Sequence, residues 1–183
     1  AAGGWGYYFD SREDEGTLPV TQLQGLRACR DAGFYVPKEI VDKAIESIES
    51  SMNNDGSVRY RPTSSKVRGG VTCAALITLW NAGRYDDPSL KLIADYIRRE
   101  IYPQFNYRRD RHAEYVMYYL AQARFILGGD DWPNFYKGYA AMFADIQRSD
   151  GSWEGVDDGE VYGTAVALLA LQLPFNRLGI YQR

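Results

Sequence analysis

The sequence predicts an all-α fold in which inner and outer helices alternate along four helical repeats. Three observations predict it. A Gly-rich aromatic turn recurs about every 45–53 residues, apolar residues between the turns follow helical spacing, and proline and glycine stand where helices begin and end. The 183 residues, 45% hydrophobic and 25% charged, have the length and composition of one globular domain. We therefore expect residues 1–183 to form a single domain.

Each repeat is expected to contain a turn, an inner helix, a break at glycine and an outer helix, and the last repeat has the inner helix alone. The opening turns are Gly3-Gly4-Trp5, Asp55-Gly56-Ser57, Phe105-Asn106-Tyr107 and Asp150-Gly151-Ser152-Trp153. The predicted helices span 21–32, 37–52, 71–82, 88–101, 113–127, 132–148 and 161–173.

The two kinds of helix differ in their apolar pattern. Helix 37–52 has a single stripe of Ile40, Val41, Ala44, Ile45 and Ile48 with charged residues opposite, which is typical of a half-buried outer helix. Segments 71–80 and 164–171 are apolar around most of their circumference, so we expect them to be covered on every side. The two cysteines, Cys29 and Cys73, are too few for a disulfide framework and are expected in the core.

Composition and charge exclude several functional classes. No run of about 18 apolar residues is present, so we expect no transmembrane segment. The net charge is −3, and an excess of basic residues in 58–111 is offset by acidic residues in 129–162, so we expect no nucleic-acid partner. Phosphate-binding Gly-rich loops, nucleophile elbows and HExxH helices are absent from the sequence.

The segment Gln147-Arg148-Ser149-Asp150-Gly151-Ser152-Trp153 resembles the Q-x-x-D-G-x-W repeat of squalene and oxidosqualene cyclases. That superfamily also includes the protein prenyltransferase β subunits. Lys137-Gly138-Tyr139 fits the start of the same motif, and Gly3-Gly4-Trp5 resembles its end. The resemblance implies an α/α toroid, and it implies that Trp5, Gln147, Asp150, Gly151 and Trp153 are structural residues of the repeat. A glycine permits the tight turn, the aspartate caps it, and the tryptophan covers the join between repeats.

The resemblance also indicates where catalytic groups would stand. Glu160-Val161-Tyr162-Gly163-Thr164-Ala165 aligns with the Asp-x-Asp-Asp-Thr-Ala motif of the cyclases, whose middle aspartate protonates the substrate. Here that residue is Tyr162, and tyrosine has an ordinary pKa of about 10, so the protonating role is expected to be lost. If the chain is an enzyme, the remaining suspects are Glu160, Tyr162 and His112.

Metal sites are not predicted. The prenyltransferase zinc ligand that precedes the threonine of this helix corresponds to Gly163, the single histidine stands before a different helix, and Cys73 has no Asp-x-Cys partner. Asp157-Asp158-Gly159-Glu160 lacks the spacing of a known calcium loop and is expected to be a solvated acidic turn. His112 with Asp110 and Glu114 is a weak candidate for an acid–base cluster. We expect no cofactor.

A ligand cavity is the remaining candidate site. If the inner helices are parallel, their starts near Gln22, Thr72, Tyr115 and Tyr162 converge on one mouth of the ring, where the helix dipoles attract anions. The residues expected to line the cavity are Trp80, Tyr115, Tyr118, Tyr119 and Tyr162. The alternative is that these aromatic residues fill the core.

Taken together, the sequence predicts a toroid-type domain without the standard catalytic acid or zinc ligands. It is expected to act as a scaffold or as a binding module for a small apolar or isoprenoid-like ligand. The alternatives are an isoprenoid-processing enzyme with non-standard residues and a carbohydrate-active toroid enzyme.

Four inner and three outer helices are fewer than a closed ring of this kind contains, so we expect an incomplete ring, the C-terminal part of a longer toroid. An upstream segment of the protein or a second copy of the chain would cover the open flank. The sequence does not indicate a cell compartment.

Overall fold

The computed structural model describes residues 4–8, 10, 15, 17–155 and 158–175, and this part of the chain is helical. It contains seven α-helices, a π-helical turn η1 and a 3-10 turn η2, and its only β pairing is two isolated bridges. The elements are α1 Leu18–Asp31, α2 Lys38–Ser51, α3 Gly69–Asn81, α4 Pro88–Tyr96, η1 Ile97–Ile101, α5 Ala113–Leu127, α6 Asp131–Ile146, α7 Gly159–Leu171 and η2 Leu173–Phe175. The all-α prediction is confirmed. None of the described helices is long and apolar enough to cross a membrane.

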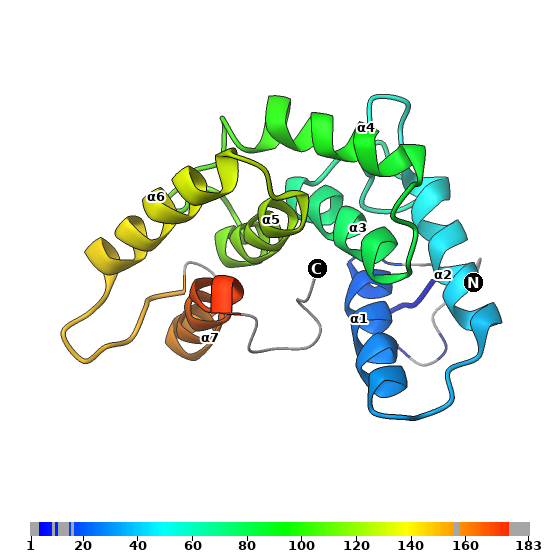
Figure 1. The fold of residues 1–183 in the computed structure, drawn as a ribbon, viewed down its shortest axis with the longest axis horizontal. Helices are drawn as coiled ribbons and strands as arrows, with labels where there is room; N and C mark the ends of the chain where they lie inside the picture. Colours follow the sequence, from blue (N-terminus) through cyan, green and yellow to red (C-terminus); the bar gives the residue numbers. More distant parts are fainter. Residues whose placement is uncertain (1–3, 9, 11–14, 16, 156–157, 176–183) are drawn as a thin grey trace. The chain divides into compact units, whose positions relative to one another are not determined.

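The chain divides into two compact units, residues 1–103 and 104–183. In the first unit α1 packs beside α3, α2 packs against both of them, and α4 packs against α3 (Figure 1). In the second unit α5 packs against α6 and against α7 (Figure 1).

Helix ends lie where glycine and proline predicted them. Gly33, Gly83 and Gly128 follow helices with φ of +90°, +83° and +60°, values that glycine adopts without a Cβ clash. Pro88 begins α4, and Asp87 caps that helix by accepting a hydrogen bond from the Ser89 amide at 2.8 Å.

The predicted helix 88–101 differs from the structure in its last turn. It continues past α4 as the π-helical turn η1, in which the Tyr102 amide donates to the carbonyl of Ile97. Ile97 and Ile101 are both buried, and the side chain of Ile101 lies against Gly69 at the start of α3. The wider turn therefore keeps the apolar side of this segment against α3 to its end.

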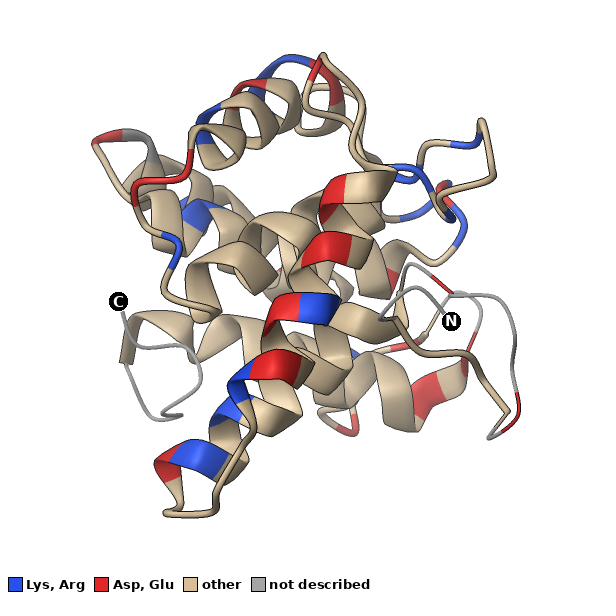
Figure 2. Ribbon diagram, turned by 90° about the vertical axis from the view of Figure 1, so that its right-hand side faces the viewer, with Lys and Arg blue, Asp and Glu red and all other residues tan. Residues whose placement is uncertain are grey.

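The predicted contrast in burial holds for α2 and α3. Charged residues alternate along the exposed face of α2, the helix that faces the viewer in Figure 2, while Ala44, Ile45 and Ile48 are buried. Ile40 is 40% exposed, so the predicted stripe was wrong at its first residue, which stands in the first turn of α2. In α3, eleven of the thirteen residues are buried.

Two burial predictions were wrong. Cys73 is buried, but Cys29 is exposed on α1, because it lies on the side of that helix away from the buried Val20 and Leu23. The expectation that α7 is covered on every side was also wrong: only four of its thirteen residues are buried, and Val161 and Leu168 are 87% and 52% exposed. Helix α7 therefore has more apolar residues than the described residues of the chain bury.

Two Asp-Gly-Ser turns share one hydrogen-bonding pattern. The Asp55 carboxylate accepts from the Ser57 amide at 2.9 Å and from its hydroxyl at 2.7 Å, and Asp150 accepts from Ser152 at 3.0 and 2.7 Å. These hydrogen bonds lower the pKa of both aspartates. The glycine between has φ of +89° in the first turn and +87° in the second.

Each turn is tied to the helix that follows it. The residue after the serine donates its amide to a threonine hydroxyl: Val58 to Thr72 of α3 at 3.0 Å, and Trp153 to Thr164 of α7 at 2.9 Å. The indole of Trp153 is 5% exposed, and its Nε1 donates to the Phe143 carbonyl at the end of α6 at 2.8 Å. Trp153 therefore joins α6, the turn and α7, which confirms that the indole is buried at this join.

We expect Trp153→Ala to lower the free energy of unfolding by about 3–5 kcal/mol, the usual cost of removing a large buried aromatic side chain. Trp153→Phe is the matched control, because it keeps a ring against Phe143 and loses the indole hydrogen bond, and its loss should be smaller. Thermal and urea unfolding followed by circular dichroism measure both. An unchanged melting temperature in Trp153→Ala would contradict this role.

Candidate functional site

Tyrosine side chains gather where α5 and α7 begin in the second unit. Tyr115, Tyr118 and Tyr119 are three or four residues apart and therefore lie on one side of α5. The ring of Tyr119 meets those of Tyr115 and Tyr118 edge to face, with centroids 4.7 and 4.9 Å apart. Tyr119 is 2% exposed, and burial raises the pKa of its hydroxyl above the ordinary value. This tyrosine is a core residue, whereas Tyr115, Tyr118 and Tyr162 are half-buried.

Trp80, the fifth residue expected to line a cavity, belongs to the first unit. It is half-buried on α3 and packs edge to face against Tyr85, with ring centroids 4.8 Å apart. The four tyrosines of the predicted site therefore lie in the second unit, and Trp80 lies in the first.

A buried carboxylate accompanies the tyrosines. Glu114 stands in the first turn of α5 and has no exposed surface. The positive end of the helix dipole favours a carboxylate there. Burial raises the pKa of Tyr107 to about 12, and the charge of Glu114 contributes to that shift. The sequence analysis considered Glu114 only as a partner of His112. Glu114 stands three residues before Met117 and seven before Ala121, a spacing that puts all three on the buried face of the helix.

Tyr162 stands where the resemblance places the proton donor. Burial raises the pKa of its hydroxyl, and the charges of Asp158 and Glu114 raise it further. A higher pKa makes Tyr162 a weaker acid than ordinary tyrosine, so its hydroxyl suits hydrogen bonding rather than protonation of an alkene.

Gly163 stands where the resemblance places an acid or a zinc ligand, and the backbone occupies the space that a side chain needs. A Cβ on Gly163 would lie 2.6 Å from the Gly155 nitrogen and 2.8 Å from the Glu154 carbonyl carbon. Both atoms are main-chain, so a side chain at position 163 requires the loop before α7 to move.

The other two suspects are surface residues. Glu160 is exposed and accepts a hydrogen bond from Arg148 Nη1 at 2.8 Å. His112 is exposed at the N-cap of α5 with a left-handed φ of 54°. Of its proposed acid–base partners, Asp110 accepts from the Asn106 amide at 2.8 Å, and Glu114 is buried. These three side chains lie in different environments.

Groups of three or more His, Cys, Asp or Glu side chains able to hold a metal ion are absent from the described residues. In the acidic segment 157–160, Asp157 lies outside the described part of the chain. Among the repeat residues, Gln147 donates its side-chain amide to the Gly151 carbonyl at 2.9 Å. The Trp5 carbonyl accepts from the Glu15 amide at 2.9 Å. Both contacts are made to the main chain of nearby residues.

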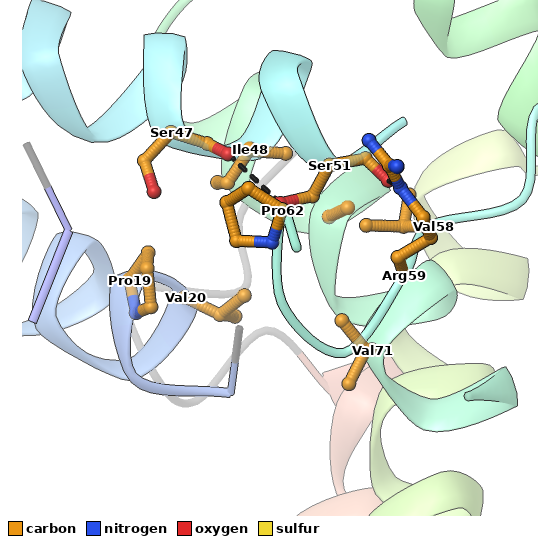
Figure 3. Close-up of a pocket in the computed structure, with 10 residues that line it drawn as sticks. Pro19, Val20, Ser47, Ile48, Ser51, Val58, Arg59, Pro62 and Val71 are labelled. Carbon is orange, nitrogen blue, oxygen red and sulfur yellow. Dashed lines mark hydrogen bonds between the residues drawn. The ribbon is translucent and has the colours of Figure 1, made fainter. Parts of the chain in front are cut away.

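One cavity lies between α1, α2, α3 and the connection from α2 to α3 (Figure 3). Its volume is about 10 Å³, which is room for roughly one water molecule. The polar groups around it bind one another: Ser51 Oγ donates to the Ser47 carbonyl at 3.1 Å, and the Arg59 amide donates to the Ser51 carbonyl at 2.9 Å. This cavity is a structural join between helices and is too small for a substrate.

A larger groove of about 520 Å³ is lined by α1, the start of α2 and the end of α3. Its volume falls in the range of small-molecule sites. Leu23, Val41 and Ile45 are among its apolar lining residues. Of the four basic residues that line it, Arg27 and Arg30 pair with Asp31, and Lys38 pairs with Asp42. Sequence reasoning missed this groove, because its residues come from three separate helices and form no motif.

Comparisons of this chain with protein-family models, with curated proteins and with solved structures found no match.

We expect Gly163→Ala to destabilise the protein by about 1–3 kcal/mol, because the added methyl group would overlap the backbone of residues 154–155. The matched control is Gly138→Ala in α6, where no described atom lies within 4 Å of the new Cβ and alanine favours the helix. Chemical unfolding of the two variants measures the difference. If Gly163→Ala were as stable as Gly138→Ala, the close approach of the loop would be wrong.

Proposed function

We propose that this chain is a helical-repeat domain of the cyclase and prenyltransferase type that binds or scaffolds and does not catalyse the reactions of those enzymes. The observation that carries the proposal is the backbone at Gly163, which fills the place of the acid or zinc ligand that the resemblance implies.

The two Asp-Gly-Ser turns support the repeat part of the proposal. They lie 95 residues apart, have the same hydrogen bonds and the same positive φ at glycine, and each is joined through a threonine to the next helix. Two such turns within one chain favour duplication of a structural unit.

Tyr162 and Glu160, the other two positions of the catalytic motif, support the proposal that the chain does not catalyse those reactions. The raised pKa of Tyr162 weakens it as an acid, and Glu160 forms an exposed ion pair with Arg148. Glu160 is therefore a solvent-exposed residue held by Arg148 and does not face an enclosed site.

The groove in the first unit supports a binding role. Its lining combines apolar residues with basic residues that mostly pair with acidic neighbours, which fits a small apolar molecule. In the second unit, the half-buried Tyr118 and Tyr162 offer rings and hydroxyl groups near the buried Glu114 to an isoprenoid-like ligand.

Glu114 favours a second candidate, an isoprenoid-processing enzyme. A wholly buried carboxylate beside tyrosines is an arrangement that enzymes use for proton transfer. In that case Glu114, and not Glu160, would accept the proton, with Tyr162 beside it.

We expect the purified protein to contain no stoichiometric zinc and to leave squalene unchanged, because positions 162 and 163 hold a weak acid and a glycine. Elemental analysis and gas chromatography of squalene incubations measure these two properties. About one zinc per chain would contradict the first expectation. Squalene conversion that is lost in folded Glu114→Gln or Tyr162→Phe would establish the second candidate instead.

A further inference from the structure

The first unit shows what packs on an Asp-Gly-Ser turn and on the helix that follows it. A Cβ on Gly56 would lie 2.2 Å from the backbone oxygen of Leu92, so the backbone of α4 rests directly on the turn. Gly69, three residues before the joining Thr72, faces the side chain of Ile101 in η1. Helix α4 with η1 thus covers the turn and one face of α3.

Within the described residues, the same positions of the second unit are exposed. The two turns are matched by their Asp-Gly-Ser sequence, so Gly151 corresponds to Gly56, and no described atom lies within 4 Å of a Cβ on Gly151. The two helices are matched separately, by Thr72 and Thr164, because the second turn stands three residues closer to its threonine. Val161 matches Gly69 and is 87% exposed. Leu168 is 52% exposed and Ala165 is exposed, whereas their counterparts Leu76 and Cys73 have no exposed surface.

We propose that Gly151, Val161, Ala165 and Leu168, the α7 surface, bind an amphipathic α-helix of a partner polypeptide as the first unit binds α4 and η1. Single exposed apolar residues are ordinary on protein surfaces. Here three of them stand at i, i+4 and i+7 on one helix face. The turn that is hydrogen-bonded to this helix contains a glycine whose counterpart is covered by a helix backbone. The inference goes beyond the proposed function, since it holds whether or not the chain is an enzyme.

The first unit also indicates the chemistry of the partner helix. The buried residues of α4 and η1 are Leu90, Ile93, Ala94, Ile97 and Ile101. The carboxyl of Asp55 has a lowered pKa, chiefly through hydrogen bonds from Ser57 and also through the charge of Arg99 in η1. Residues 150–160, which lead into the α7 surface, contain the exposed acidic residues Asp150, Glu154, Asp158 and Glu160, and Arg148 pairs with Glu160. The partner helix is therefore expected to carry apolar residues at this spacing and basic residues beside them.

A peptide with the sequence of residues 87–102 is the probe for this surface. A lactam between Lys91 and Asp95, both exposed in the chain and four residues apart, would hold the short peptide helical. Fluorescence anisotropy of the labelled peptide against the full 183-residue chain should show saturable binding. The same peptide with Ile93→Asp and Ile97→Asp should not bind.

Variants of the chain locate the binding site. Val161→Glu and Leu168→Glu should each weaken peptide binding at least tenfold, whereas Ile40→Glu, at an exposed apolar residue of α2, should leave it unchanged. Gly151→Asn should weaken binding because its Cβ blocks the approach of a helix, and asparagine tolerates the positive φ. Gly33→Asn is its control, with φ of +90° and no described atom within 4 Å. Melting curves establish that each variant is folded.

The proposal is overturned if the peptide does not bind saturably or if folded Leu168→Glu binds it as well as the unaltered chain does. Light scattering tests the other occupant. A dimer that Leu168→Glu dissociates and that excess peptide leaves intact would assign the α7 surface to a second copy of the chain, and would overturn the proposal as well.

Discussion

The Asp-Gly-Ser turn is the local constraint on which the arrangement of helices depends. Its aspartate holds the serine amide and hydroxyl, and its glycine has a φ that other residues rarely adopt. The next residue then donates its amide to a threonine at the start of a helix. Because each of the two turns is hydrogen-bonded to the helix that follows it, the positions of α3 and α7 are restricted locally. Apolar packing then completes an arrangement that the turn has already restricted.

Most of the secondary structure could be predicted from the sequence, because its signals are local. The predicted range 113–127 coincides with α5, and the other helices differ by a few residues at their ends. Gly33 and Gly83 end helices for a reason that acts within one turn of backbone, and Pro88 begins a helix for a similar reason. The π-helical turn at Ile97 could not be predicted, since it depends on how the isoleucines meet α3.

The candidate site was less predictable, because burial depends on residues distant in sequence. The predicted helix ranges put four tyrosines near the starts of α5 and α7, and their role as a cavity lining stays a prediction. The burial of Glu114 was missed. An acidic residue at a helix start is ordinarily solvated, and only the packing around α5 shows otherwise. The opposite error occurred in α7 and at Cys29: hydrophobicity reports how much surface favours burial and does not report what is present to cover it.

The contact at Gly163 bears on the order in which mutations can occur. Gly155, Gly159 and Gly163 approach one another so closely that the Cβ of a residue at position 155 would lie 2.2 Å from the Gly159 oxygen. An acidic side chain at position 163 can therefore be acquired only after the loop has been reshaped, a change that brings no chemistry by itself. Natural selection cannot favour that first step for catalysis. The close packing of the three glycines thus separates this sequence from an acid at position 163 by more than one substitution.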